Sequence, residues 1–129
     1  MKKYFVFLIL TMASNSYGQR TDDTEIVLKS YEVEKQPVYK GGIGEFDKYM
    51  NANFRIDAEK GYEGKMILEL IVEKDGSLSN IAIIRDFGYG TSRETLRCLE
   101  ACPKWEAGEK NGKTVRTLCM VSIDIKDNR

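Results

Sequence analysis

The stretch MILELIVEKDGSLSNIAIIR, residues 66–85, decides the fold of this chain. Apolar residues occupy alternate positions before and after a central Lys-Asp-Gly-Ser sequence, and alternation with a period of two is typical of β-strands. Gly76 can adopt the positive φ that a tight turn requires. These residues therefore predict a β-hairpin with strands over residues 66–73 and 78–85.

A helical pattern precedes this hairpin, in residues 42–53. Apolar residues recur there at steps of three and four, so that they share one face of a helix. These residues are Ile43, Phe46, Tyr49, Met50 and Phe54. Pro37 and the glycine pair at residues 41–42 mark the turn before the helix.

A second helix and a third strand follow the hairpin. Residues 91–94, Thr-Ser-Arg-Glu, have the sequence of a capping box, and Pro103 ends the helix. Residues 111–112, Asn-Gly, predict a tight turn, after which residues 115–125 alternate like a strand. We predict an α+β fold in which two helices pack on one face of a three-stranded antiparallel sheet.

The first 18 residues have the organisation of a signal peptide. Two lysines precede an apolar run over residues 4–13, and a polar stretch with the small residues Ser16 and Gly18 follows. We predict cleavage near Gly18 and a periplasmic product without a lipid-anchoring cysteine at its start. The run is about half as long as the ~20 residues that span a bilayer, so we expect no stable membrane insertion. The alternatives are an uncleaved anchor and an N-terminal core strand.

The remaining chain divides into a polar lead-in segment, residues 19–36, and one domain, residues 37–126. Acidic and basic residues nearly balance, which gives no general attraction to nucleic acid. The 129 residues include no histidine, so the sequence lacks the commonest general base and the commonest metal ligand. We therefore predict a non-enzymatic protein with no cofactor and no metal site.

Three cysteines, Cys98, Cys102 and Cys119, raise the question of a disulfide in an oxidising compartment. Cys98 and Cys102 lie one helical turn apart, with a Cβ separation of about 5–6 Å, whereas a disulfide needs about 3.8 Å. Cys102 follows the apolar stripe of the second helix, and Cys119 points from the last strand toward the same core. These two are therefore the candidate disulfide, and the alternative is three buried thiols that pack as small apolar side chains.

Several short motifs occur in this chain in a defined order and spacing over about ninety residues. They are Pro37 with Gly41-Gly42, Tyr62-Glu63-Gly64-Lys65, Val72-Glu73-Lys74-Asp75-Gly76-Ser77-Leu78, Pro103-Lys104-Trp105, Gly108, and Asn111-Gly112-Lys113-Thr114-Val115-Arg116. No single motif is specific, but their combination resembles the C-terminal domain of TonB proteins, in the form common in Bacteroidetes. The chain would then be a stand-alone domain of this family behind a signal peptide.

The resemblance implies a role in contacting outer-membrane transporters. TonB domains of this kind bind an extended segment of the receptor by adding it to the edge of the sheet, along the last strand. An edge strand offers unpaired amides and carbonyls for this purpose. The residues implied here are Val115, Arg116, Thr117, Leu118, Cys119, Met120, Val121, Ser122 and Ile123. The expected partner is an envelope protein, with a TonB-dependent outer-membrane receptor as the first candidate.

One alternative of a different class is a structural envelope protein whose edge strand pairs with its own copy, which would give a homodimer. A complete TonB also has an inner-membrane helix and a long proline-rich spacer. This chain has two prolines in all and about eighteen residues between the predicted signal peptide and the domain. We therefore expect no energy transduction through an anchor of its own.

Overall fold

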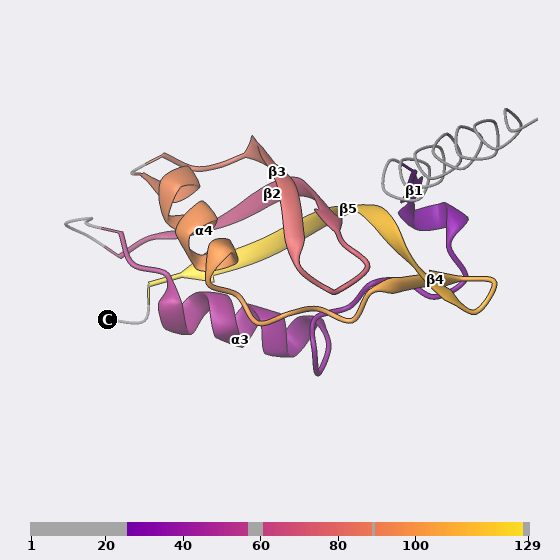
Figure 1. Cartoon of the computed structure of the whole chain (residues 1–129). Helices are drawn as coiled ribbons and strands as arrows, with labels where there is room; N and C mark the ends of the chain where they lie inside the picture. The colour runs from indigo at the N-terminus through magenta and orange to yellow at the C-terminus, as the bar shows by residue number, and fades with distance from the viewer. Residues whose placement is uncertain (1–25, 57–60, 89, 128–129) are drawn as a thin grey trace, which may run out of the picture.

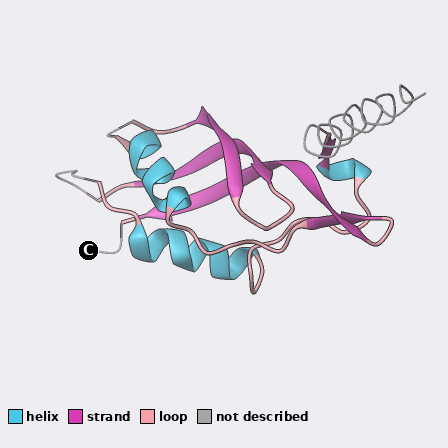
Figure 2. Cartoon of the chain, in the orientation of Figure 1, coloured by secondary structure: helices cyan, strands magenta, loops and turns pink. Residues whose placement is uncertain are grey.

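The computed structural model describes residues 26–56, 61–88 and 90–127, and the predicted signal peptide lies outside the described residues. Two helices pack against a curled mixed sheet (Figure 1, Figure 2). The elements in chain order are β1 (Val27–Lys29), a 3₁₀ turn η2 (Ser30–Glu32), α3 (Ile43–Asn53), β2 (Glu63–Val72), β3 (Leu78–Arg85), α4 (Thr91–Glu100), β4 (Gly108–Lys110) and β5 (Lys113–Lys126). Within these ranges, no helix has the length and apolar character needed to cross a membrane.

The predicted hairpin forms as strands β2 and β3. At its turn Gly76 has a φ of 88°, and its amide donates to the Glu73 carbonyl at 2.9 Å. The Gly76 carbonyl accepts a hydrogen bond from the Trp105 amide at 2.8 Å, and a Cβ on Gly76 would lie 2.0 Å from the Trp105 carbonyl oxygen. The turn therefore needs glycine for its backbone conformation and for the close approach of the chain that follows α4.

The longest strand, β5, pairs antiparallel with β2. The register runs from Glu63 opposite Lys126 to Val72 opposite Thr117 without a bulge. With β3 on the other side of β2, these strands make the three-stranded antiparallel sheet that the sequence predicts.

The strand count differs from the prediction, because two short strands extend this sheet. The turn at residues 111–112 has positive φ at both positions and folds β4 back onto the start of β5. β1 comes from the segment predicted as a polar lead-in, and it pairs with residues 116–118 of β5. Its pairing is parallel, so the sheet is mixed rather than antiparallel throughout.

The core lies between the sheet and the two helices. Alternate residues of β2 and β5 are buried there, and these are Met66, Leu68, Leu70, Val72, Thr117, Cys119, Val121, Ile123 and Ile125. Helix α3 contributes Phe46 and Met50, and α4 contributes Cys98 and Leu99. The Tyr49 hydroxyl joins the helices, because it donates to the Cys98 carbonyl at 2.8 Å.

The capping box predicted at the start of α4 is wrong. Gly90, with a φ of 79°, is the N-cap residue, and the helix begins one residue earlier than that motif requires. Thr91 is therefore inside the helix, where its hydroxyl is buried without a hydrogen-bond partner. The Glu94 carboxylate instead accepts the Arg55 amide at 2.7 Å and pairs with Arg97, so it ties α4 to the end of α3.

Residues 34–38 run beside the chain that leads into β4. Val38 and Glu106 exchange two backbone hydrogen bonds, at 3.1 and 2.8 Å, and a further pair of bonds joins Lys35 to Glu109. Trp105, next to this pairing, is buried with its ring 5.0 Å from that of Phe46. This arrangement carries the start of the domain past the outer side of β5.

Candidate protein-binding edge

The predicted binding residues, 115–123, all lie on β5. The first four of them are already paired with short strands of the same chain, and β1 occupies the side away from β2. Val115 pairs with Gly108 of β4, and residues 116–118 pair with β1. Beyond Leu118, no strand of the described chain pairs with this side of β5. The available edge is therefore shorter than the predicted site.

The side chain of Asn51 identifies the backbone groups that face outward from β5. Its Nδ2 donates to the Asp124 carbonyl at 3.0 Å, and its Oδ1 accepts the Lys126 amide at 3.0 Å. Backbone polar groups alternate between the two sides of a strand, and the register of β5 with β2 is regular. The N–H and C=O groups of Met120 and Ser122 therefore also point away from β2.

Asn51 also closes one end of this edge. Helix α3 holds its side chain in place, because Nδ2 donates to the Asp47 carbonyl at 2.9 Å as well. Strand β1 closes the other end. Between them lies a short stretch of unpaired edge, which we call the open window: the N–H and C=O groups of Met120 and Ser122 and the N–H of Asp124. Unpaired edges of this kind are templates for an added strand.

A groove with a volume of about 340 Å³ runs beside the open window. Its lining residues are Ser30, Gln36, Pro37, Ile43, Trp105 and residues 119–122. Two of its apolar side chains are unusually exposed, Met120 at 66% and Ile43 at 59%. An added strand gains affinity from main-chain hydrogen bonds and specificity from pockets for its alternate side chains. The open window provides the main-chain groups, and the groove provides space for side chains.

The structure contains no bond between any two of the cysteines at 98, 102 and 119, all of which it describes; Cys98 and Cys119 are buried and Cys102 is half-buried. Burial raises the pKa of the Cys98 thiol and of the Cys119 thiol to about 11. The thiolate is the nucleophilic form, so these buried thiols are poor nucleophiles. The disulfide between Cys102 and Cys119 stays a prediction.

Two carboxylates with lowered pKa values are held by arginines. A hydrogen bond from Arg116, with Nε 2.6 Å from Oε1, lowers the pKa of Glu73. Arg97 lowers the pKa of Glu94 in the same way. A general acid at neutral pH needs a raised pKa, so these ion pairs serve the structure. Across the described residues, no group of three or more Cys, Asp or Glu side chains could hold a metal ion.

Sequence reasoning missed two features of this site, the pairing of β1 and the contacts of Asn51. The signal for β1 is the apolar alternation of Ile26 and Leu28, which is too short to distinguish a strand from a loop. Asn51 gives no local signal, because its partners on β5 are 73 and 75 residues away along the chain.

Comparison with known families identifies the domain. The family described as "Gram-negative bacterial TonB protein C-terminal" matches residues 55–125, from just after α3 into β5, and the matched segment contains the open window. A search of curated proteins gave no match, and a search of solved structures gave none either. Because the family match covers more than half of the sequence, the chain belongs to the TonB C-terminal domain family.

Proposed function

We propose that this protein is a periplasmic, non-catalytic binding domain that adds an extended segment of an envelope protein to the open window of β5. The family to which it belongs is one of non-enzymatic protein-interaction domains. A TonB-dependent outer-membrane receptor is the first candidate partner. The observation that supports this proposal is the set of unpaired backbone groups at Met120 and Ser122, which lie beside an apolar groove.

The size of the open window indicates a weak and reversible complex. Each backbone hydrogen bond contributes about 0.5–1.5 kcal/mol. The open window offers only a handful of them, and the cost of ordering a flexible peptide offsets much of the gain. Side chains that enter the groove must therefore supply part of the affinity. A partner segment longer than the open window would have to displace β1 from residues 116–118.

Substitution of Ser122 by proline tests the proposal. The Ser122 amide points away from β2, so proline removes a donor for the partner without breaking the β2–β5 ladder. Ser122→Ala is the matched control, since it changes the side chain and keeps the amide. Circular dichroism and thermal melting must first show that both variants fold like the native protein.

The assay is affinity capture from an envelope extract followed by mass spectrometry. The native protein and Ser122→Ala should capture an outer-membrane receptor, and Ser122→Pro should lose it. Equal capture by the proline variant would show that the partner does not use this edge. If the native protein captures no envelope protein, the proposed function is wrong.

Self-association is the second candidate function, because the open window can complement a copy of itself. In an antiparallel pair of β5 strands centred on Ser122, Met120 of one copy would face Asp124 of the other, and their outward groups could exchange hydrogen bonds. Light scattering over a range of protein concentrations distinguishes the two functions. A dimer that Ser122→Pro dissociates would favour self-assembly, and a monomer at all concentrations would exclude it.

A further inference from the structure

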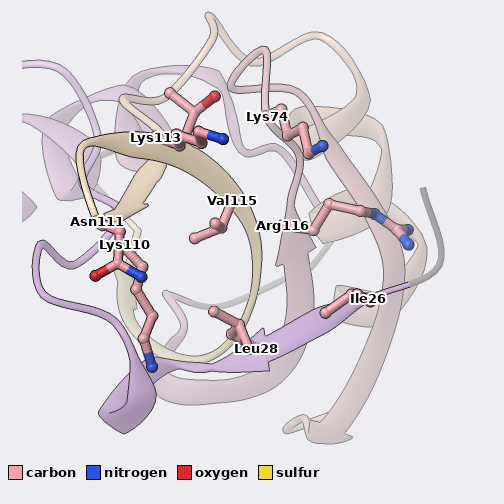
Figure 3. A pocket seen from close by; sticks show the side chains of 9 residues that line it. Ile26, Leu28, Lys74, Lys110, Asn111, Lys113, Val115 and Arg116 are labelled. Atoms are coloured by element: carbon pink, nitrogen blue, oxygen red, sulfur yellow. The ribbon is translucent and has the colours of Figure 1, made fainter. Parts of the chain in front are cut away.

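A second pocket, with a volume of about 350 Å³, lies at the start of β5 (Figure 3). Asn51 contacts the other end of this strand. Two apolar side chains, Leu28 of β1 and Val115 of β5, lie at its centre. Cationic side chains surround them: Lys74, Lys110, Lys113 and Arg116. The pocket therefore combines an apolar floor with a cationic rim, and the rim comes from the β2–β3 turn and from the β4–β5 hairpin.

The three lysines of this rim lack acidic partners. Elsewhere, Lys35 pairs with two glutamates and Lys104 pairs with an aspartate. In the rim itself Glu73 neutralises Arg116. Within the described ranges, however, none of the three rim lysines forms a salt bridge. The whole sequence has equal numbers of acidic and basic residues, so this positive charge is a local excess.

We propose that this pocket binds an acidic segment of a protein partner. Carboxylates of the segment would contact the three rim lysines, while an apolar side chain would rest on Leu28 and Val115. Bringing like charges together raises the energy of the free protein, and an anionic ligand relieves that repulsion. The apolar floor favours a ligand that alternates acidic and apolar groups over a simple inorganic anion.

The position of the pocket favours a peptide over a membrane surface. Val115 and Arg116 of the pocket lie on the same strand as Met120, so about 13–16 Å of extended chain separates the pocket from the open window. A few residues of an extended peptide span that distance. One partner segment could therefore occupy both places, although binding at the pocket uses side-chain charge and does not require strand addition.

The test uses a rhodamine-labelled hexapeptide that alternates glutamate and leucine, with fluorescence anisotropy as the readout. A second peptide, with glutamine in place of glutamate, controls for apolar binding. The pocket variant of the full chain carries Lys74→Gln, Lys110→Gln and Lys113→Gln. The control variant carries Lys40→Gln, Lys48→Gln and Lys126→Gln. Both variants lose the same charge, but the control lysines lie outside the pocket.

The native protein should bind the acidic peptide and not the glutamine peptide, and binding should weaken when the salt concentration rises from 20 to 200 mM. Three exposed lysine–carboxylate contacts together correspond to a change on the order of tenfold in the dissociation constant. We expect that loss in the pocket variant and a change of less than about twofold in the control variant.

Three results would overturn the proposal. The first is equal weakening in both variants, which would mean that only net charge matters. The second is no binding of the acidic peptide to the native protein at millimolar concentration. The third is binding to phosphatidylglycerol vesicles that depends on the rim lysines without any binding of the peptide, which would assign the pocket to a membrane surface. Because none of these readouts involves Ser122, failure here is distinguishable from failure of strand addition.

Discussion

Replacing Asn51 by alanine should destabilise the fold and lengthen the open window. The substitution removes the donor to the Asp124 carbonyl and the acceptor of the Lys126 amide. Both backbone groups then become available at the outer side of β5. Asn51 also makes a third hydrogen bond, to the Asp47 carbonyl within α3, but this bond is local to the helix.

The expected net loss of stability is about 0.5–1 kcal/mol. Each hydrogen bond between α3 and β5 contributes about 0.5–1.5 kcal/mol, and these two lie at the lower end because water can reach the exposed backbone groups. The higher helix propensity of alanine returns roughly half a kcal/mol. For a domain of this size, the net loss corresponds to a fall of about 2–5 °C in Tm.

Asn53→Ala is the matched control, because Asn53 is on the same helix and its side chain donates only to the Tyr49 carbonyl one turn earlier. Urea denaturation should give a lower midpoint for Asn51→Ala than for Asn53→Ala. Amide hydrogen exchange should become faster at Lys126 in the first variant alone. Equal midpoints together with unchanged exchange at Lys126 would refute the role assigned to the Asn51 side chain.

Three further changes test other parts of the structure. Glu73→Gln should lower the urea midpoint at pH 7 relative to the native protein. The hydrogen bond from Arg116 lowers the pKa of Glu73 in the folded state, so its contribution to stability is fully present above the ordinary pKa of 4.5 and is lost as the pH falls through the lowered pKa. A difference in midpoint that does not shrink as the pH falls below 4.5 would contradict this assignment. Gly76→Ala should lower the free energy of unfolding, measured by urea denaturation, by more than about 1 kcal/mol, because alanine disfavours the positive φ and its Cβ would clash with the Trp105 carbonyl oxygen. An unchanged free energy of unfolding would mean that the turn rearranges freely. Thiol titration of protein isolated from the periplasm should find one free cysteine if Cys102 and Cys119 form a disulfide, and three if all the cysteines remain reduced.

The central sheet was predictable because its signals are local. Alternation over residues 66–85, interrupted by Gly76, is sufficient to identify a hairpin, and the alternation of residues 115–125 identifies the last strand. The starting point of α4 was not predictable in detail, because Gly90 and the capping-box sequence after it offered competing starts. Local sequence alone does not decide between them.

The sequence predicts which strand forms the candidate site, but it does not predict which part of that strand is unpaired. Which backbone groups of β5 remain free depends on what pairs with it from elsewhere, and both β1 and Asn51 reach it through tertiary contacts. The rim lysines of the second pocket, Lys74, Lys110 and Lys113, likewise come together only after the hairpins fold toward each other. A sequence pattern indicates whether a segment is a helix or a strand, but it does not indicate which other segments pair with it or pack against it.

The pairing of β2 with β5 has a consequence for the time course of folding. These neighbouring strands are separated in the sequence by β3, α4 and β4, so their ladder forms only after a long loop has closed. Proteins dominated by such non-local pairings fold in milliseconds to seconds, far more slowly than helical bundles of similar length. The β2–β3 hairpin can form early, but the open window acquires its shape only when β5 arrives. A newly synthesised chain should therefore gain its ability to bind in the last and slowest step of folding. Stopped-flow refolding should show fluorescence of Trp105 and peptide binding developing with the same rate constant.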